Sequence, residues 1–151
     1  MSVINEMRLD FTATSENEAF ARLAVSGFML PLDPTVEELA DVKTAVSEAV
    51  TNAIIHGYAG RRGMVSLFAD YDGDGCLTVR IIDHGCGIGD IQRAREPFFT
   101  TLPGEERSGM GFTVMESFMD DVDVTSAPGK GTTVLMRKQI RLRDNVLPRQ
   151  A

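Results

Sequence analysis

The chain has little cysteine and no long apolar run, and each shortage excludes a class of protein. Its two cysteines, Cys76 and Cys86, are too few for a disulfide framework or a four-ligand zinc site. We expect both to be small apolar side chains in or near a strand of a reduced, cytoplasmic protein. No apolar segment approaches the roughly 20 residues that cross a bilayer, and residues 1–6 lack the pattern of a signal peptide.

Basic residues are also in short supply, with 15 Lys and Arg against 22 Asp and Glu and a net charge of −7. Nucleic acids and anionic membranes are bound through basic surfaces, so we expect direct binding to neither. At 151 residues and 43% apolar content, the chain can bury one ordinary core. Without repeats or an internal linker, it is expected to form a single domain over residues 1–151, with a partly disordered basic tail from about residue 139 to 151.

The two common nucleotide-binding motifs are absent as well. Gly85 and Gly87 fit the start of a dinucleotide fingerprint, but Asp90 occupies the place of its third glycine. A P-loop requires Ser or Thr after Gly-Lys, whereas residues 129–131 read Gly-Lys-Gly. A phosphate-binding site in this chain must therefore be of another kind.

The hydrophobic periodicity predicts strands and helices without strict alternation along the chain. Strands are expected at 7–13, 64–71, 76–83, 122–125 and 132–136, and helices at 15–29, about 35–57, 91–95 and 112–119. Residues 96–109 have no clear period and read as a long mobile loop. This order predicts an α/β (α+β) two-layer sandwich, with a mixed, mostly antiparallel sheet and helices on one face.

The first two predicted helices have assignable ends and apolar faces. Ser15 and Glu18 have the spacing of a capping box. The apolar face of this first helix is expected to leave Arg22 to one side and to comprise Ala19, Phe20, Leu23, Ala24 and Phe28. The second helix is expected to end at Gly57, and its buried side to comprise Val36, Leu39, Val42, Val46, Val50 and Ala53.

A polar stripe lies opposite that buried side. Glu48, Asn52 and His56 follow one another at i+4 spacing, which puts them on one face of a helix. A carboxylate can take up a proton, and an amide oxygen can bind a hard cation. The stripe alone would equally describe a solvated helix face, and for His56 a capping or core role at the helix end is favoured over metal binding.

Two glycine clusters follow the stripe. Asp83 ends a predicted strand, where its carboxylate can accept a hydrogen bond from an exocyclic amine such as that of adenine. Gly85 and Gly87 allow the backbone to pass close to a flat base. Gly109 and Gly111 precede a predicted helix and offer backbone N–H groups to phosphate oxygens. Taken singly, Asp-x-Gly is also a common strand-ending turn.

Together these motifs resemble a known family. Glu48-x-x-x-Asn52, Asp83-x-Gly85-x-Gly87, Gly109-x-Gly111 and Gly129-x-Gly131-Thr132 resemble, in order, the four boxes of the GHKL ATP-binding superfamily, which includes gyrase and the sensor histidine kinases. Residues 48–58, 99–101 and 106–112 are closer still to the bacterial anti-sigma-factor serine kinases of sporulation. The resemblance runs from residue 7 to about 138. It implies a Bergerat-type ATP-binding fold with a mobile ATP lid.

The resemblance implies a role for each matching residue. Asn52 is expected to bind Mg²⁺, Glu48 to act as general base, and Asp83 to read adenine with Gly85 and Gly87 beneath the base. Thr132 is expected to support the adenine pocket. The nucleotide-binding lid and its hinge are expected to comprise Thr100, Thr101, Ser108, Gly109, Met110, Gly111 and Phe112.

Three further positions are less specific. Arg107 resembles a catalytic lid arginine that neutralises the γ-phosphoryl charge, although a surface salt bridge is an equal alternative. Arg22 matches an arginine of the partner-binding surface, against the alternative of an ordinary exposed arginine. Leu102 lies in the lid where a basic residue would not be surprising, so contacts to the γ-phosphate there are expected to be fewer.

The implied function is that of a homodimeric ATP- or ADP-binding protein that sequesters a sporulation sigma factor of the sigma F type. With ATP and Mg²⁺ it would phosphorylate a serine of an anti-anti-sigma factor. The alternative is a non-catalytic module that binds the sigma factor in a nucleotide-dependent way. The detached ATP domain of a sensor histidine kinase is disfavoured, because the chain has no helical hairpin with a phosphoacceptor histidine. A gyrase-like ATPase would need a second domain.

Overall fold

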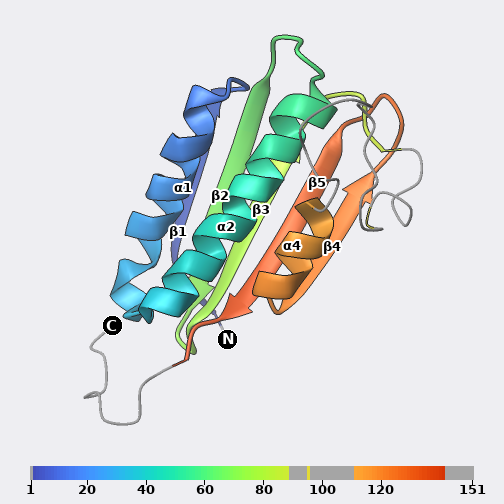
Figure 1. Cartoon of the computed structure of the whole chain (residues 1–151). Helices are drawn as coiled ribbons and strands as arrows, with labels where there is room; N and C mark the ends of the chain where they lie inside the picture. The colour runs from blue at the N-terminus through green and yellow to red at the C-terminus, as the bar shows by residue number, and fades with distance from the viewer. Residues whose placement is uncertain (1, 89–94, 96–110, 142–151) are drawn as a thin grey trace.

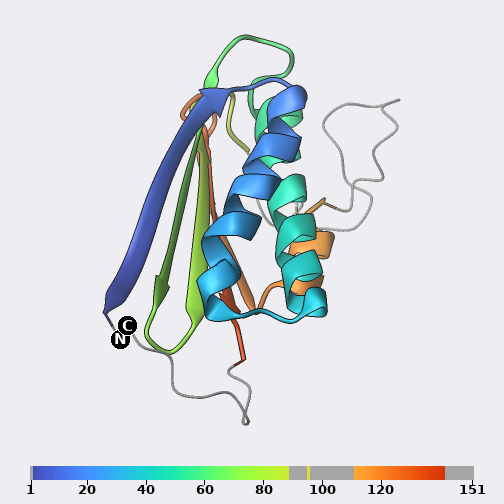
Figure 2. The ribbon, with the colours of Figure 1, turned by 90° about the vertical axis from the view of Figure 1, so that its left-hand side faces the viewer.

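One layer of helices covers one face of an antiparallel sheet in the computed structural model of the chain, which describes residues 2–88, 95 and 111–141 (Figures 1 and 2). Within those residues the strands are β1 (Val3–Thr12), β2 (Met64–Asp72), β3 (Cys76–Asp83), β4 (Asp121–Ser126) and β5 (Thr132–Gln139). The α-helices are α1 (Glu16–Met29), α2 (Val36–Asn52) and α4 (Gly111–Phe118). The two-layer prediction is confirmed.

The strand order is β1-β2-β3-β5-β4, and every neighbouring pair runs antiparallel. β2 and β3 are joined by the predicted hairpin, in which the Asp72 carboxylate accepts hydrogen bonds from the backbone N–H groups of Asp74 and Cys76. β3 and β4 both pair with β5, which places Asp83 and Ser126 on either side of Thr132. The ends of three strands therefore meet at one edge of the sheet.

The buried face of α1 differs from the predicted one. Phe20 and Leu23 are 52% and 62% exposed, whereas Ala21, Val25 and Met29 are buried. The helix carries two apolar stripes, and the one that contains Ala21, Val25 and Met29 faces the sheet. Phe28 was assigned correctly to the inner side, since it packs against the core with its ring 5.1 Å from that of Tyr71.

The capping box also lies elsewhere. Ser15 has a helical backbone conformation and its side chain makes no capping hydrogen bond. Instead, Thr35 caps α2: its hydroxyl accepts from the Glu38 N–H at 3.0 Å, and the Glu38 carboxylate accepts from the Thr35 N–H at 2.9 Å. Helix α2 is thus fixed at its N-terminus by reciprocal hydrogen bonds.

α2 packs its apolar side on the sheet largely as expected. Val42, Val46 and Val50 are fully buried, although Val36, in the first turn, is 86% exposed. The α-helical pattern ends at Asn52, and a π-helical turn continues it from Ala53 to Gly57. Because this turn widens the spacing, the regular i+4 stripe does not extend to His56.

Several predicted elements lie outside the described residues. These are the helix at 91–95 apart from Arg95, the loop 96–109, and the tail beyond residue 141. The helices of the described part of the chain include none with the length and apolar character of a membrane span.

Removing the Thr35 hydroxyl should lower stability, whereas removing the Ser15 hydroxyl should not. We expect Thr35→Ala to reduce the free energy of unfolding by about 1 kcal/mol, because an N-terminal donor of α2 loses its acceptor. Ser15→Ala is the matched control, with a change near zero because its side chain makes no capping bond. Urea denaturation of both variants measures the difference. Equal losses would contradict the assignment of the cap.

Candidate functional site

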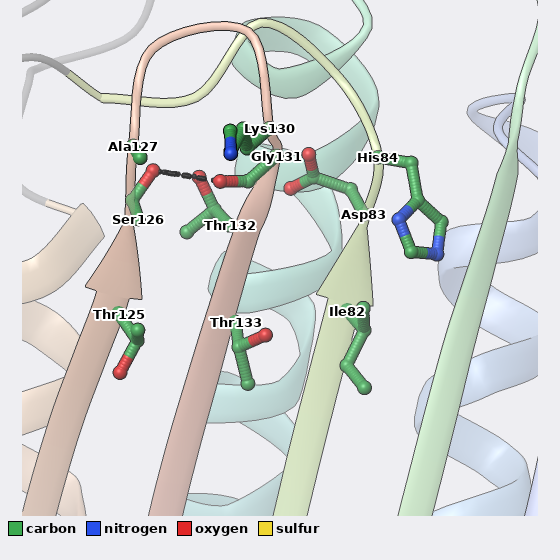
Figure 3. Close-up of a pocket in the computed structure, with 10 residues that line it drawn as sticks. All are labelled: Ile82, Asp83, His84, Thr125, Ser126, Ala127, Lys130, Gly131, Thr132 and Thr133. Atoms are coloured by element: carbon green, nitrogen blue, oxygen red, sulfur yellow. Dashed lines mark hydrogen bonds between the residues drawn. The ribbon is translucent and has the colours of Figure 1, made fainter.

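The ends of β3, β4 and β5 bring three polar side chains together (Figure 3). Asp83 is the last residue of β3, Thr132 the first of β5 and Ser126 the last of β4. Asp83 and Thr132 are 4% and 8% exposed, and apart from the tyrosines Tyr58 and Tyr71 they are the only buried polar side chains in the described part of the chain. The same strand ends line a hollow of about 240 Å³. Polar groups buried at the edge of a sheet are typical of a binding site.

The Asp83 carboxylate is held in a tight backbone setting. Its Oδ1 accepts a hydrogen bond from the Gly85 N–H at 2.9 Å. Burial raises the pKa of this carboxyl above its usual value, although hydrogen bonds from the backbone of Gly85 and Thr132 oppose the shift. A Cβ on Gly57 would lie 2.7 Å from the carboxylate carbon, so only glycine fits at that position without displacing Asp83.

Glycines allow the loop that follows Asp83 to touch two other segments. A Cβ on Gly85 would overlap the carbonyl oxygen of Gly57, and a Cβ on Gly87 would overlap that of Ala127. Between them, the Cys86 N–H donates to the Gly57 carbonyl at 2.8 Å. At Gly85 and Gly87 the backbone thus passes close to other parts of the chain. The approach of this backbone to a flat base stays a prediction.

The Thr132 hydroxyl lies 2.8 Å from that of Ser126, as the dashed line in Figure 3 marks. Ser126 Oγ also accepts from the Ile88 N–H at 2.7 Å and lies 2.9 Å from the Gly131 carbonyl oxygen, to which it can donate. The Thr132 hydroxyl thus belongs to a hydrogen-bonded group beside Asp83, and its role in supporting an adenine pocket stays a prediction.

The second part of the site lies between α2 and α4, which pack side by side (Figure 1). Glu48 and Asn52 are half-buried on α2. A Cβ on Gly111, the first residue of α4, would lie 3.0 Å from Asn52 Nδ2 and 3.4 Å from Glu48 Oε2. The next residue, Phe112, is buried in the core. Glu48 and Asn52, the first two residues of the predicted stripe, thus lie beside the start of α4.

The surroundings of Asn52 suit a cation that is shared with a ligand. Within residues 2–88, 95 and 111–141, no group of three His, Cys, Asp or Glu side chains could enclose a metal ion. The side chains of Glu48 and Asn52 are instead close together with glycine backbone opposite. This donor set fits Mg²⁺, which typically takes one or two protein oxygens and completes its shell with phosphate oxygens and water.

The structure also places four other residues named in the sequence analysis. His56 lies in the π-helical turn and its carbonyl accepts from the Cys86 thiol at 3.1 Å, which fits a role at the helix end. Cys76 is in β3 as expected, but Cys86 is exposed and is not a buried apolar side chain. Arg22 is half-buried, with Nη1 at 3.4 Å from both Glu18 Oε1 and Ser47 Oγ.

Part of the predicted site lies outside the described residues: Thr100, Thr101, Leu102, Arg107, Ser108, Gly109 and Met110. Sequence reasoning also missed three residues at the described part of the site. Gly57, Tyr58 and Ser126 all contact the Asp83 loop. Gly57 stands at the end of the Glu48–Asn52 motif, which was a usable signal. Tyr58 and Ser126 bind residues that are 26 and 38 positions away in the sequence, so no local sequence pattern predicts these contacts.

Comparison with known proteins agrees with this geometry. The sequence matches the family model of the histidine kinase-like ATPase domain over residues 11–138. A protein named anti-sigma F factor from Thermoanaerobacter sp. (strain X514) is 54% identical over 140 residues, which cover 93% of this chain and 97% of the relative. Another of that name, from Clostridium acetobutylicum, is 56% identical over 138 residues, which cover 91% and 96% of the two chains.

Solved structures share the fold. The RsbU and RsbW domains of a Mycobacterium tuberculosis protein align with a TM-score of 0.65 at 20% identity, over 90% of this chain and 32% of that one. The mycobacterial sensor histidine kinase MprB aligns with a TM-score of 0.55 at 18% identity, over 91% and 99% of the two chains. At such identities the likeness is one of fold alone. From the sequence matches, the chain belongs to the anti-sigma F factor family and carries a histidine kinase-like ATPase domain.

Proposed function

We propose that the chain binds and sequesters a sigma factor of the sigma F type and, with ATP and Mg²⁺, phosphorylates a serine of an anti-anti-sigma factor. One observation carries the proposal. The buried Asp83 carboxylate abuts Gly57 at the end of α2 and its π-helical turn, and the same helix presents Glu48 and Asn52 to the start of α4. The first arrangement suits a purine, and the second suits the phosphates and the transfer step. The names of the relatives support the sigma-factor partner.

The adenine would lie against the backbone at Gly85 and Gly87, with its exocyclic amine donating to Asp83 and with Thr132 supporting the pocket. The phosphates would extend toward Gly111 and the N-terminus of α4, where free N–H groups and the helix dipole favour anions. Phe112 fixes this helix end in the core. The remaining contacts to the phosphates are assigned to Thr100, Thr101 and residues 108–110 of the lid.

Asn52 Oδ1 is the protein oxygen that would hold Mg²⁺, which when bound neutralises phosphate charge. Glu48 would accept the proton from the serine hydroxyl of the protein substrate. As the Oγ–P bond forms, the bond between the γ-phosphorus and the β–γ bridging oxygen breaks and ADP leaves. Arg107 would stabilise the charge of the transferred group. In this reaction type the protein contributes mainly positioning and electrostatic stabilisation.

Arg22 is assigned to the surface that binds the protein partners, and the active unit is proposed to be a homodimer. The Arg22 side chain is tied to Ser47, the residue that precedes Glu48 on α2. A partner that engages Arg22 would therefore touch a side chain linked to the helix of the proposed base.

The alternative function is that of a module that binds the sigma factor in a nucleotide-dependent way without phosphorylating anything. Such a module would bind adenine at the same residues as the kinase, but its Glu48 would not accept a proton from a substrate serine. The half-buried setting of Glu48 beside Gly111 and Asn52 favours a kinase, because a carboxylate needed only for solubility would have no reason to face the phosphate end.

Glu48→Gln should lower phosphotransfer by a factor of about 10² to 10⁴ while leaving ADP and sigma-factor binding unchanged, because only the proton acceptor is removed. The assay is incubation with labelled ATP, Mg²⁺ and an anti-anti-sigma protein, scored for phosphoserine. Glu37→Gln, an exposed residue in the first turn of the same helix, is the matched control and should retain full activity. A Glu48→Gln protein as fast as the original would rule out the base assignment, and an inactive original chain would favour the alternative function.

Asp83→Asn should weaken ADP binding and yet stabilise the unliganded protein at neutral pH. Because burial raises the pKa of Asp83 in the folded state, its ionisation lowers stability above the usual aspartate pKa of 3.8, and this loss vanishes at lower pH. The gain in melting temperature on substitution should therefore be present at pH 7 and shrink as the pH falls toward 4. Calorimetric titration with ADP should show at least a roughly ten-fold loss of affinity.

The ADP titration and the pH dependence of the melting temperature test different claims about Asp83. An Asp83→Asn protein that binds ADP as tightly as the original would contradict the role of Asp83 in reading adenine. A gain in stability that does not depend on pH would instead contradict the burial of an ionised carboxylate.

A further inference from the structure

We propose that Tyr58 and Ser126 are positioning residues that hold the loop 84–88 in the shape that the adenine requires. The inference rests on the proposed function, since it concerns the same nucleotide site. Neither side chain belongs to the adenine-reading set assigned above. Each instead makes a hydrogen bond to the backbone at one end of this loop.

Tyr58 secures the beginning of the loop. Its side chain is 6% exposed, and its hydroxyl donates to the Met64 carbonyl at 2.5 Å and accepts from the His84 N–H at 2.9 Å. The ring packs directly against the backbone of Gly63, where a Cβ would overlap it. The Tyr58 hydroxyl thereby joins His84, which lies 26 positions further along the sequence, to Met64, the first residue of β2.

Ser126 secures the other end of the loop. Its hydroxyl accepts from the Ile88 N–H at 2.7 Å and lies within hydrogen-bond distance of Thr132 Oγ1 and the Gly131 carbonyl. Figure 3 shows this side chain at the tip of β4, turned toward Thr132. Ile88 is thus tied to the end of β4 and, through Ser126, to the start of β5.

Backbone hydrogen bonds connect the two clamps. In the middle of the loop, Cys86 donates its N–H to the Gly57 carbonyl at 2.8 Å and accepts from the Gly129 N–H at 2.7 Å. The loop is thereby bonded both to Gly57 and to the β4–β5 turn. Two further bonds involve side chains, from the Gly85 N–H to the Asp83 carboxylate and from the Cys86 thiol to the His56 carbonyl. Tyr58 and Ser126 are side chains from outside the loop that bind its backbone, so substitution can remove their bonds without altering the loop itself.

The clamp acts directly on the group that would read the base. Tyr58 follows Gly57, and Gly57 packs so closely against the Asp83 carboxylate that a Cβ would not fit between them. Tyr58 also holds His84, the residue after Asp83. If the Tyr58 hydroxyl were absent, the segments on both sides of that carboxylate could shift. An amine–carboxylate hydrogen bond loses strength within a few tenths of an ångström and with small changes of angle.

The chain provides a matched control. Tyr71 is buried to the same degree, at 5% exposed, and its hydroxyl also makes a hydrogen bond, accepting from Asn5 Nδ2 at 2.9 Å. Tyr71 lies in the β1–β2 half of the sheet and contacts neither Asp83 nor its loop. Loss of either hydroxyl should have a similar effect on stability, but only Tyr58 should affect the nucleotide.

The test is calorimetric titration of full-length Tyr58→Phe, Ser126→Ala and Tyr71→Phe with ADP and with inosine diphosphate, which carries an oxygen in place of the adenine amine. We expect the first two variants to bind ADP about five- to twenty-fold more weakly, as the loss of one positioned hydrogen bond implies. Their preference for ADP over inosine diphosphate should fall as well. Tyr71→Phe should keep both the affinity and the preference of the original chain.

Amide hydrogen exchange without nucleotide provides a second readout. Tyr58→Phe should speed exchange at His84 and Cys86, and Ser126→Ala should speed it at Ile88, whereas Tyr71→Phe should change none of the three. This measurement does not depend on the proposed function, and it still tests the clamp if one variant proves too unstable for titration.

Each outcome has one meaning. Variants that match Tyr71→Phe in ADP preference, in a chain whose original form prefers ADP, would overturn this inference and leave the proposed function intact. An original chain that binds ADP no better than inosine diphosphate would overturn both, because adenine would then not be read at Asp83. Unchanged exchange rates in both Tyr58→Phe and Ser126→Ala would overturn the clamp alone.

Discussion

The candidate site depends on the burial of one carboxylate at the end of a strand. An ionised carboxyl group removed from water requires hydrogen-bond donors, and Asp83 has the backbone of Gly85 and Thr132 beside it. Those donors reach the carboxylate because glycines at 57, 85 and 131 permit backbone segments to touch where a Cβ would not fit. The raised pKa of Asp83 indicates that compensation is incomplete. An unliganded site that is less stable than it could be is expected where the missing donor comes from a ligand.

Helix α2 joins this acid to the rest of the site. Its apolar side packs on the sheet, its polar side presents Glu48 and Asn52 to the start of α4, and its π-helical end delivers Gly57 to Asp83. The two halves of the site that are proposed to bind the base and the phosphates are therefore joined by one helix, which is capped at its far end by Thr35.

Most of the secondary structure, and the place of Glu48 and Asn52 on one helix, could be predicted from sequence, because they follow from short-range patterns. Alternation and turn residues located β2, β3 and their hairpin, and i+4 spacing paired Glu48 with Asn52. The errors arose where two local patterns competed. Phe20 and Leu23 marked one apolar stripe of α1, yet the stripe that contains Ala21, Val25 and Met29 is the buried one. Ser15 and Thr35 both had capping-box partners, and the backbone conformation decided between them. The Tyr58 and Ser126 contacts depend on the tertiary fold, which no local window contains.

The two halves of the site have different consequences for a protein that both phosphorylates and sequesters. On the proposed function, transfer removes only the γ-phosphoryl group, so the adenine and its contacts at Asp83, Thr132 and the loop 84–88 are the same before and after the reaction. A ligand can shift a conformational equilibrium only through contacts that differ between its forms. On this proposal, any difference in partner binding between the ATP and ADP states originates at the phosphate end, at Glu48, Asn52 and Gly111 and at the lid residues assigned to the phosphates. Arg22 Nη1 lies 3.4 Å from the hydroxyl of Ser47, the residue before Glu48 on α2, which gives such a difference a short physical route to the proposed partner surface.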